Sequence, residues 1–168
     1  LLEIDLSPLD TSSATDLSDL FRDSLGLLAV SLADLDTSHV TTMRSMFDGA
    51  SSLRSLDLSG LDTSHVTDMS YLFDHCRSLE GLDLSSFDTS SVITMDYLFG
   101  GCLSLEALDL SGFDTSKVTD MSSMFSDCRA LEHLDISSFD EGNVTCMAGM
   151  FDGCGVLAEV VLAGRVHH

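Results

Sequence analysis

The sequence predicts an α/β repeat solenoid, a right-handed coil with a parallel sheet on one face and short helices on the other. The first observation is a fixed period, because the segment L-D-[LI]-S-x-[LF]-D recurs every 26 residues, at Leu56, Leu82, Leu108 and Leu134. The second is that each copy is too small to bury its own apolar face. Stacking of neighbouring copies is therefore what makes a core.

A single solenoid domain is expected over residues 1–165. Its six repeats begin near residues 4, 30, 56, 82, 108 and 134, and Val160 opens a final strand. Leu1 is in phase with Leu27 and Leu53, so the chain is expected to begin inside a repeat of a longer protein. Residues 166–168, which end in two histidines, resemble the remnant of an expression tag.

A strand is the first element expected in each unit. In residues 79–87, apolar side chains occupy the first, fourth, sixth and ninth positions. Leu82 and Leu84 then face the core while Asp83 faces solvent. Seven such strands are expected to stack into one parallel sheet. The Asp-Thr-Ser that follows each strand favours a turn, because these side chains bond their own backbone.

The second element is predicted to be a short helix. Met69, Leu72, Phe73 and Cys76 are spaced i, i+3, i+4 and i+7, which is the apolar stripe of a helix of about two to three turns. Repetition of one inward position predicts a column of aromatic core residues, formed by Phe21, Phe47, Phe73, Phe99, Phe125 and Phe151.

Composition excludes two classes of partner. The net charge is −21, with 28 acidic residues against 7 Lys and Arg, while 44% of residues are hydrophobic and can fill a core. Such a surface repels nucleic acid and anionic lipid over roughly 10 Å at ~0.1 M salt. The chain also lacks an apolar run of the ~20 residues that span a bilayer. We expect no nucleic-acid partner and no direct membrane insertion.

Four cysteines share one position of the repeat: Cys76, Cys102, Cys128 and Cys154. The earlier repeats have Ala50 and Ser24 there, so the position selects a small residue and buried free thiols are expected. A disulfide between neighbouring units and a metal site are the alternatives. Cys146 lies at the predicted helix start and is expected to be exposed.

Aspartates form two rows. The strand row consists of Asp57, Asp83, Asp109 and Asp135, and the turn row of Asp36, Asp62, Asp88, Asp114 and Asp140. Like charges in neighbouring units repel, so raised pKa values are expected unless a cation or a hydrogen-bond donor compensates. For the turn row we predict capping of the turn. For the strand row we predict a recognition face, with calcium binding as the alternative.

The run from Leu82 to Cys102, LDLSSFDTSSVITMDYLFGGC, has near-copies along the chain. It resembles the roughly 25-residue repeat of BspA-like leucine-rich repeat surface proteins, also known as a mycoplasma-type domain of unknown function. The resemblance covers essentially the whole chain. It implies a leucine-rich-repeat-like coil, a bacterial extracellular or cell-surface location, and adhesion to host or neighbouring cells. It implies no catalytic residues.

The sequence thus predicts a non-enzymatic binding module, without a nucleophile-elbow or phosphate-loop motif. The expected ligand-binding face comprises Glu80, Asp83, Ser85, Glu106, Asp109, Ser111, Glu132, His133 and Asp135. Its partner is expected to be a protein or glycan on a host or neighbouring cell, bound by a monomer. No metal or cofactor is predicted except calcium, with Asp57, Asp83, Asp109 and Asp135 as candidate ligands. A structural spacer and a calcium-binding repeat array are the alternative functions.

Overall fold

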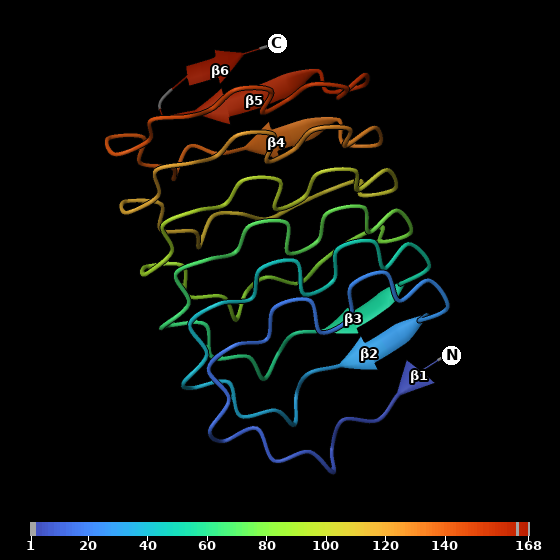
Figure 1. The fold of residues 1–168 in the computed structure, drawn as a ribbon. Coiled ribbons are helices and arrows are strands. Elements are labelled where there is room, and N and C mark those ends of the chain that lie inside the picture. Colours follow the sequence, from blue (N-terminus) through green and yellow to red (C-terminus); the bar gives the residue numbers. More distant parts are fainter. Residues whose placement is uncertain (1–2, 164, 168) are drawn as a thin grey trace.

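The computed structural model describes residues 3–163 and 165–167. The chain winds into rungs that stack in sequence order from one end of the molecule to the other, so it is a repeat solenoid (Figure 1). Its strands are short: β1 (Glu3–Ile4), β2 (Ala29–Ser31), β3 (Ser55–Asp57), β4 (His133–Asp135), β5 (Glu159–Leu162) and β6 (Arg165–His167).

The predicted single parallel sheet is interrupted. Strands β1, β2 and β3 form one parallel sheet, in which Val30 pairs with Leu56. Strands β4, β5 and β6 form a second sheet, and there β6 runs antiparallel to β5. Residues 58–132, all described, contain no strand, although Glu106 N–H still donates to Glu80 O at 3.1 Å. Backbone pairing between the middle rungs therefore lies mainly at another position of the repeat.

The predicted helices are wrong, because the described residues contain no helix and hence none that could cross a membrane. The stretch expected to be helical in the third repeat is a pair of turns. Tyr71 (φ 61°) and His75 (φ 59°) are left-handed there, and a left-handed residue breaks the helical path. The same two positions have positive φ in the other five repeats: Asp19, Asp23, Ser45, Gly49, Tyr97, Gly101, Ser123, Asp127, Gly149 and Gly153.

Backbone groups of these turns bond to the next rung instead of to the preceding helical turn. Tyr71 N–H donates to Asp96 O at 2.9 Å, and His75 N–H donates to Gly100 O at 2.7 Å. Two successive turns nevertheless bury Met69, Leu72, Phe73 and Cys76, as a helix would. The apolar stripe was therefore real, and only the backbone conformation inferred from it was wrong.

An unbroken column of parallel bridges runs through all six repeats at the start of this turn region. Its members are Asp16, Thr42, Asp68, Thr94, Asp120 and Cys146, each bridged to the next. The turn side of the solenoid thus carries the continuous backbone pairing that was predicted for the strand side.

The core confirms the predicted aromatic column. Successive phenylalanine rings from Phe21 to Phe151 are stacked, with centroids 5.4–5.9 Å apart. Offset stacking at this separation is favourable beyond the burial of the ring area. Because the ring spacing follows the rung spacing, the column favours a constant distance between repeats.

Threonine side chains join each rung to the next by hydrogen bonds, and all of them except Thr11 are buried. Thr63 Oγ1 donates to Asp88 O at 2.9 Å and accepts from Asp88 N–H at 2.8 Å. The same reciprocal pair joins Thr11 to Asp36, Thr37 to Asp62, Thr89 to Asp114 and Thr115 to Asp140. One hydroxyl therefore satisfies two backbone groups of the turn Asp.

The cysteine column consists of free thiols, as predicted. Cys76, Cys102 and Cys128 are buried and Cys154 is half-buried. Each thiol donates to a phenylalanine carbonyl of the preceding rung; Cys76 Sγ lies 3.2 Å from Phe47 O. Burial raises the pKa of the Cys128 thiol to about 12, which suppresses the reactive thiolate. Cys146, expected to be exposed, is half-buried.

Candidate functional site

The predicted ligand-binding face is exposed at all nine of its residues, which come from three consecutive rungs. Asp83, Ser85, Asp109 and Ser111 line one depression of about 290 Å³ between two rungs. Glu106, Glu132 and His133 line a neighbouring depression of about 600 Å³, whereas Glu80 lines a third one together with Arg54. Eight of the nine residues thus line three shallow depressions, and Asp135 lines none of these three.

Each strand-row carboxylate caps a turn. Asp83 Oδ1 accepts from the backbone N–H of Ser85 at 3.0 Å and from its hydroxyl at 2.6 Å. Asp57 and Asp109 accept from Ser59 and Ser111 in the same way, and Asp135 accepts from the N–H of Ser137. The row predicted as a recognition face therefore also stabilises the local backbone.

These hydrogen bonds decide the charge of the strand row. The serine hydroxyl and N–H lower the pKa of Asp57, Asp83, Asp109 and Asp135, which outweighs the repulsion between neighbouring rungs. The exception made for hydrogen-bond donors therefore applies to this row, because the serines compensate the repulsion. The face stays ionised at neutral pH without a cation.

The turn row confirms its predicted capping role. Asp62 Oδ1 accepts from the N–H and the hydroxyl of Ser64, at 3.0 Å and 2.6 Å. Asp36 and Asp88 make the same two bonds, whereas Asp114 and Asp140 accept the backbone N–H alone, from Ser116 and Gly142. Both rows therefore use one local device, an aspartate that bonds the residue two positions later.

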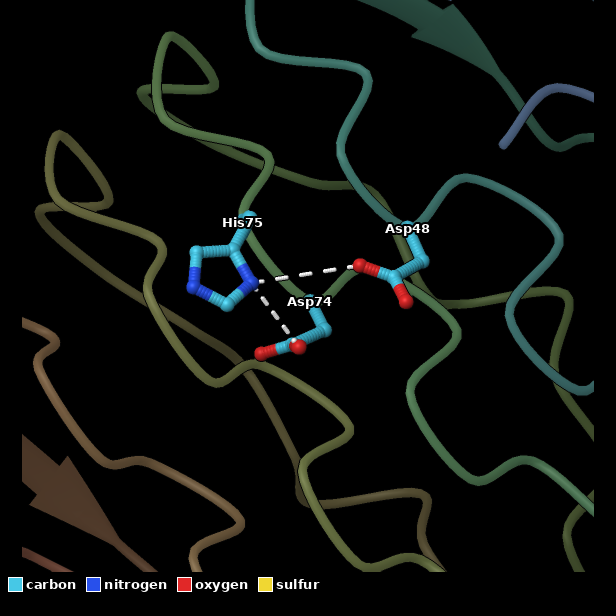
Figure 2. A group of neighbouring side chains, drawn as sticks. All are labelled: Asp48, Asp74 and His75. Carbon is cyan, nitrogen blue, oxygen red and sulfur yellow. Dashed lines mark hydrogen bonds and ion pairs between the residues drawn. The ribbon is translucent and has the colours of Figure 1, made fainter. Parts of the chain in front are cut away.

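A second candidate site, which the sequence did not reveal, lies on the turn side. Asp48 of one rung and Asp74 and His75 of the next bring three side chains together (Figure 2). His75 Nδ1 lies 2.9 Å from Asp74 Oδ2 and 3.9 Å from Asp48 Oδ1. His75 has one of the left-handed conformations described above, and its side chain is half exposed.

Asp74 is in an unusual environment for a carboxylate. Only 4% of its surface is exposed, and its Oδ1 has no hydrogen-bond partner among the described residues. An unpaired buried acceptor costs about 1–3 kcal/mol. Burial raises the pKa of Asp74 to about 6; His75 opposes this shift and Asp48 adds to it. Burial also raises the pKa of Asp48, which Arg22 and His75 oppose.

Sequence reasoning missed this cluster because it is a departure from the repeat. The position of Asp74 holds Arg22, Asp48, Gly100, Ser126 and Asp152 in the other units. The position of His75 holds Asp or Gly elsewhere. The one signal available was an acidic residue at the same position of two adjacent repeats, followed in the second by His75.

These features define the class of the molecule as a solenoid of 26-residue rungs with acidic outer rows. A family model described as "Mycoplasma protein of unknown function, DUF285" matches residues 2–82 and again residues 72–161. The chain belongs to this family, and the resemblance drawn from its repeat is thereby confirmed.

A solved structure of a leucine-rich repeat protein from T. pallidum is similar to this chain. The two share 22% sequence identity with a TM-score of 0.47, and the match covers 85% of this chain and 71% of the other. The comparison with curated protein sequences yields no match.

Proposed function

We propose that the chain is a non-enzymatic binding module that recognises a protein or glycan through its acidic strand face. The observation that carries this proposal is the depression lined by Asp83, Ser85, Asp109 and Ser111. Its two carboxylates are ionised and held in one orientation by their serines. A fixed anionic pair on neighbouring rungs suits a basic or amide-rich ligand.

The resemblance to surface proteins supports a more specific form of the proposal. The module acts on the outside of a bacterial cell, as a monomer, and its ligand lies on a host or neighbouring cell. Calcium enters as a bridge only if the ligand is itself anionic, because the strand-row carboxylates are already compensated by serine donors.

The chemistry of the face argues against catalysis. A general base works best with a pKa near the working pH, and the strand-row carboxylates have lowered pKa values. The depressions are also formed by a repeated pattern, without convergence of different catalytic groups on one point.

The test is binding to an immobilised panel of matrix proteins and glycans, run in calcium and again in chelator. The informative variant combines Asp83→Asn with Asp109→Asn. An amide Oδ1 still accepts from the serine N–H, so the turn is kept while the charge is removed. The matched control combines Asp88→Asn with Asp114→Asn, the same change in the turn row of the same rungs.

The proposal requires saturable binding that the strand-row double variant weakens at least tenfold and that the turn-row control leaves within twofold. Equal loss in both variants would show that net charge alone drives the binding. If the wild-type chain binds no member of the panel in either buffer, the result would favour a structural spacer. Loss of binding in chelator alone would show a calcium bridge.

A further inference from the structure

We propose that Asp48, Asp74 and His75 form a binding site for one divalent transition-metal ion of the zinc and cobalt class. This site lies on the turn side and does not depend on the function proposed for the strand face. Its three donor atoms all lie within 4.8 Å of one another.

The geometry matches a metal cage. An ion about 2.1 Å from its nitrogen and oxygen ligands places neighbouring ligand atoms about 3.0–3.4 Å apart. His75 Nδ1 is 2.9 Å from Asp74 Oδ2 and 3.9 Å from Asp48 Oδ1, which brackets that range. Figure 2 shows a ring nitrogen of His75 turned toward both carboxylates, and a bound ion would replace the hydrogen bond between Nδ1 and Asp74 Oδ2.

The buried carboxylate supplies an independent reason for a cation. Asp74 is almost fully buried, its Oδ1 lacks a partner among the described residues, and a second carboxylate, Asp48, lies beside it. Oδ1 faces Gly100, where a Cβ atom would come within 2.5 Å of it. The missing side chain at residue 100 thus leaves Asp74 room but provides no donor. Asp74 Oδ2 is already bonded to His75, and a cation bound between Oδ2 and Asp48 would offset the charge of both carboxylates.

The site is open on one side. His75 lines a depression of about 210 Å³ together with Asp23, Asp48 and Arg77. Through it an ion can enter and keep water on its remaining coordination positions. Arg22 Nε lies 3.9 Å from Asp48 Oδ2, so Arg22 and Arg77 are the cations that oppose binding and Asp23 is the further anion that favours it.

The ligand set selects the metal. Two carboxylate oxygens and one imidazole nitrogen suit Zn²⁺ or Co²⁺, since imidazole favours the later first-row ions. Calcium takes six to eight oxygen ligands and is poorly served by an imidazole. The site therefore binds a different kind of ion, at a different place, from the calcium array considered for the strand row.

The test is titration of chelator-treated protein with Co²⁺, followed by its visible absorption, and with Zn²⁺, followed by calorimetry. Every variant is made in a His167→Ala, His168→Ala background, because the terminal histidines could bind metal themselves. We expect one equivalent of metal. His75→Asn and Asp74→Asn are each expected to weaken binding at least tenfold.

His75→Asn is chosen because asparagine tolerates the left-handed backbone of residue 75. Asp127→Asn is the matched control, at the equivalent left-handed position two rungs away. It is expected to leave binding within twofold. A Zn²⁺-induced rise in melting temperature that His75→Asn abolishes would support the site by a second readout. Absence of binding, or equal binding by wild type and both site variants, would overturn the proposal.

Discussion

The strand row and the turn-side cluster use the same side chain in opposite electrostatic settings. Asp83 is exposed, bonded to Ser85, and has a lowered pKa. Asp74 is buried, has one oxygen without a hydrogen-bond partner among the described residues, and has a raised pKa. The first setting recurs along the chain and the second depends on residues of particular rungs. Repetition in this molecule supplies structure, and a departure from repetition is where charge remains uncompensated.

The largest expected effect tests the statement that the repeated positions supply the stability of the fold. Phe73→Ala removes a buried ring that is stacked between Phe47 and Phe99, at 5.9 Å and 5.8 Å. We expect the free energy of unfolding to fall by about 3–5 kcal/mol, because the rigid stack cannot close the cavity. Chemical denaturation measures the change. His75→Asn, two residues away but outside the repeat pattern, is the contrast; it removes the imidazole bonded to Asp74 Oδ2 and is expected to cost less, about 1–3 kcal/mol.

The next effect concerns the threonine clamps. Thr63→Val keeps the shape of a fully buried side chain but deprives Asp88 N–H and Asp88 O of their shared partner. We expect a loss of about 2–3 kcal/mol in unfolding free energy, measured by denaturation. Thr11→Val, whose clamp is more exposed, serves as the control and should cost less. Equal losses at the two positions would contradict the role given to burial.

Asp74 provides the pH prediction, which applies to the metal-free protein. Between pH 3.8 and about 6 the folded state holds the Asp74 proton while the unfolded state does not, so stability falls as the pH rises through this window. Asp74→Asn should reduce the fall to the part contributed by Asp48, whose pKa is also raised by burial, and stabilise the protein at pH 7.5 by on the order of 2 kcal/mol. Denaturation at several pH values measures both effects.

The serine-capped rows predict the reverse trend in another window. The folded pKa values of serine-capped aspartates such as Asp83 and Asp88 lie below the ordinary value of 3.8, so their stabilisation is present above that value and is lost as the pH falls below it. The unfolding free energy should therefore rise with pH below 3.8, because of the serine-capped aspartates, and fall with pH above 3.8, because of Asp74. A single slope of one sign across both windows would contradict the comparison.

The columns of core residues could be predicted from the sequence, because a fixed period repeats each inward position in every rung. Phe73 and Cys76 were placed in the core on that ground, and the structure confirms it. The helix could not be distinguished from paired turns, since both bury positions i, i+3, i+4 and i+7. Only the left-handed residues at Tyr71 and His75 separate them, and neither is a glycine.

The turn-side cluster was beyond a repeat-by-repeat comparison for a different reason. Asp48 and Asp74 lie 26 residues apart, and their side chains meet only because the rungs stack. The environment of Asp74 depends in addition on Gly100 in a third rung. A local sequence pattern contains none of these contacts, whereas the Asp-x-Ser turns of the strand row are wholly local.

The smallest expected effect tests whether the strand row is held ionised by its serines. Ser85→Ala removes the hydroxyl bond to Asp83 but keeps the backbone N–H bond. Since the hydroxyl is the largest cause of the lowered pKa, the pKa of Asp83 should rise toward its ordinary value, while Asp109 serves as an internal reference. Carboxyl NMR titration resolves the two groups. An unchanged Asp83 titration would mean that the backbone alone fixes the charge of the face, and the proposed ligand site would then tolerate loss of its serines.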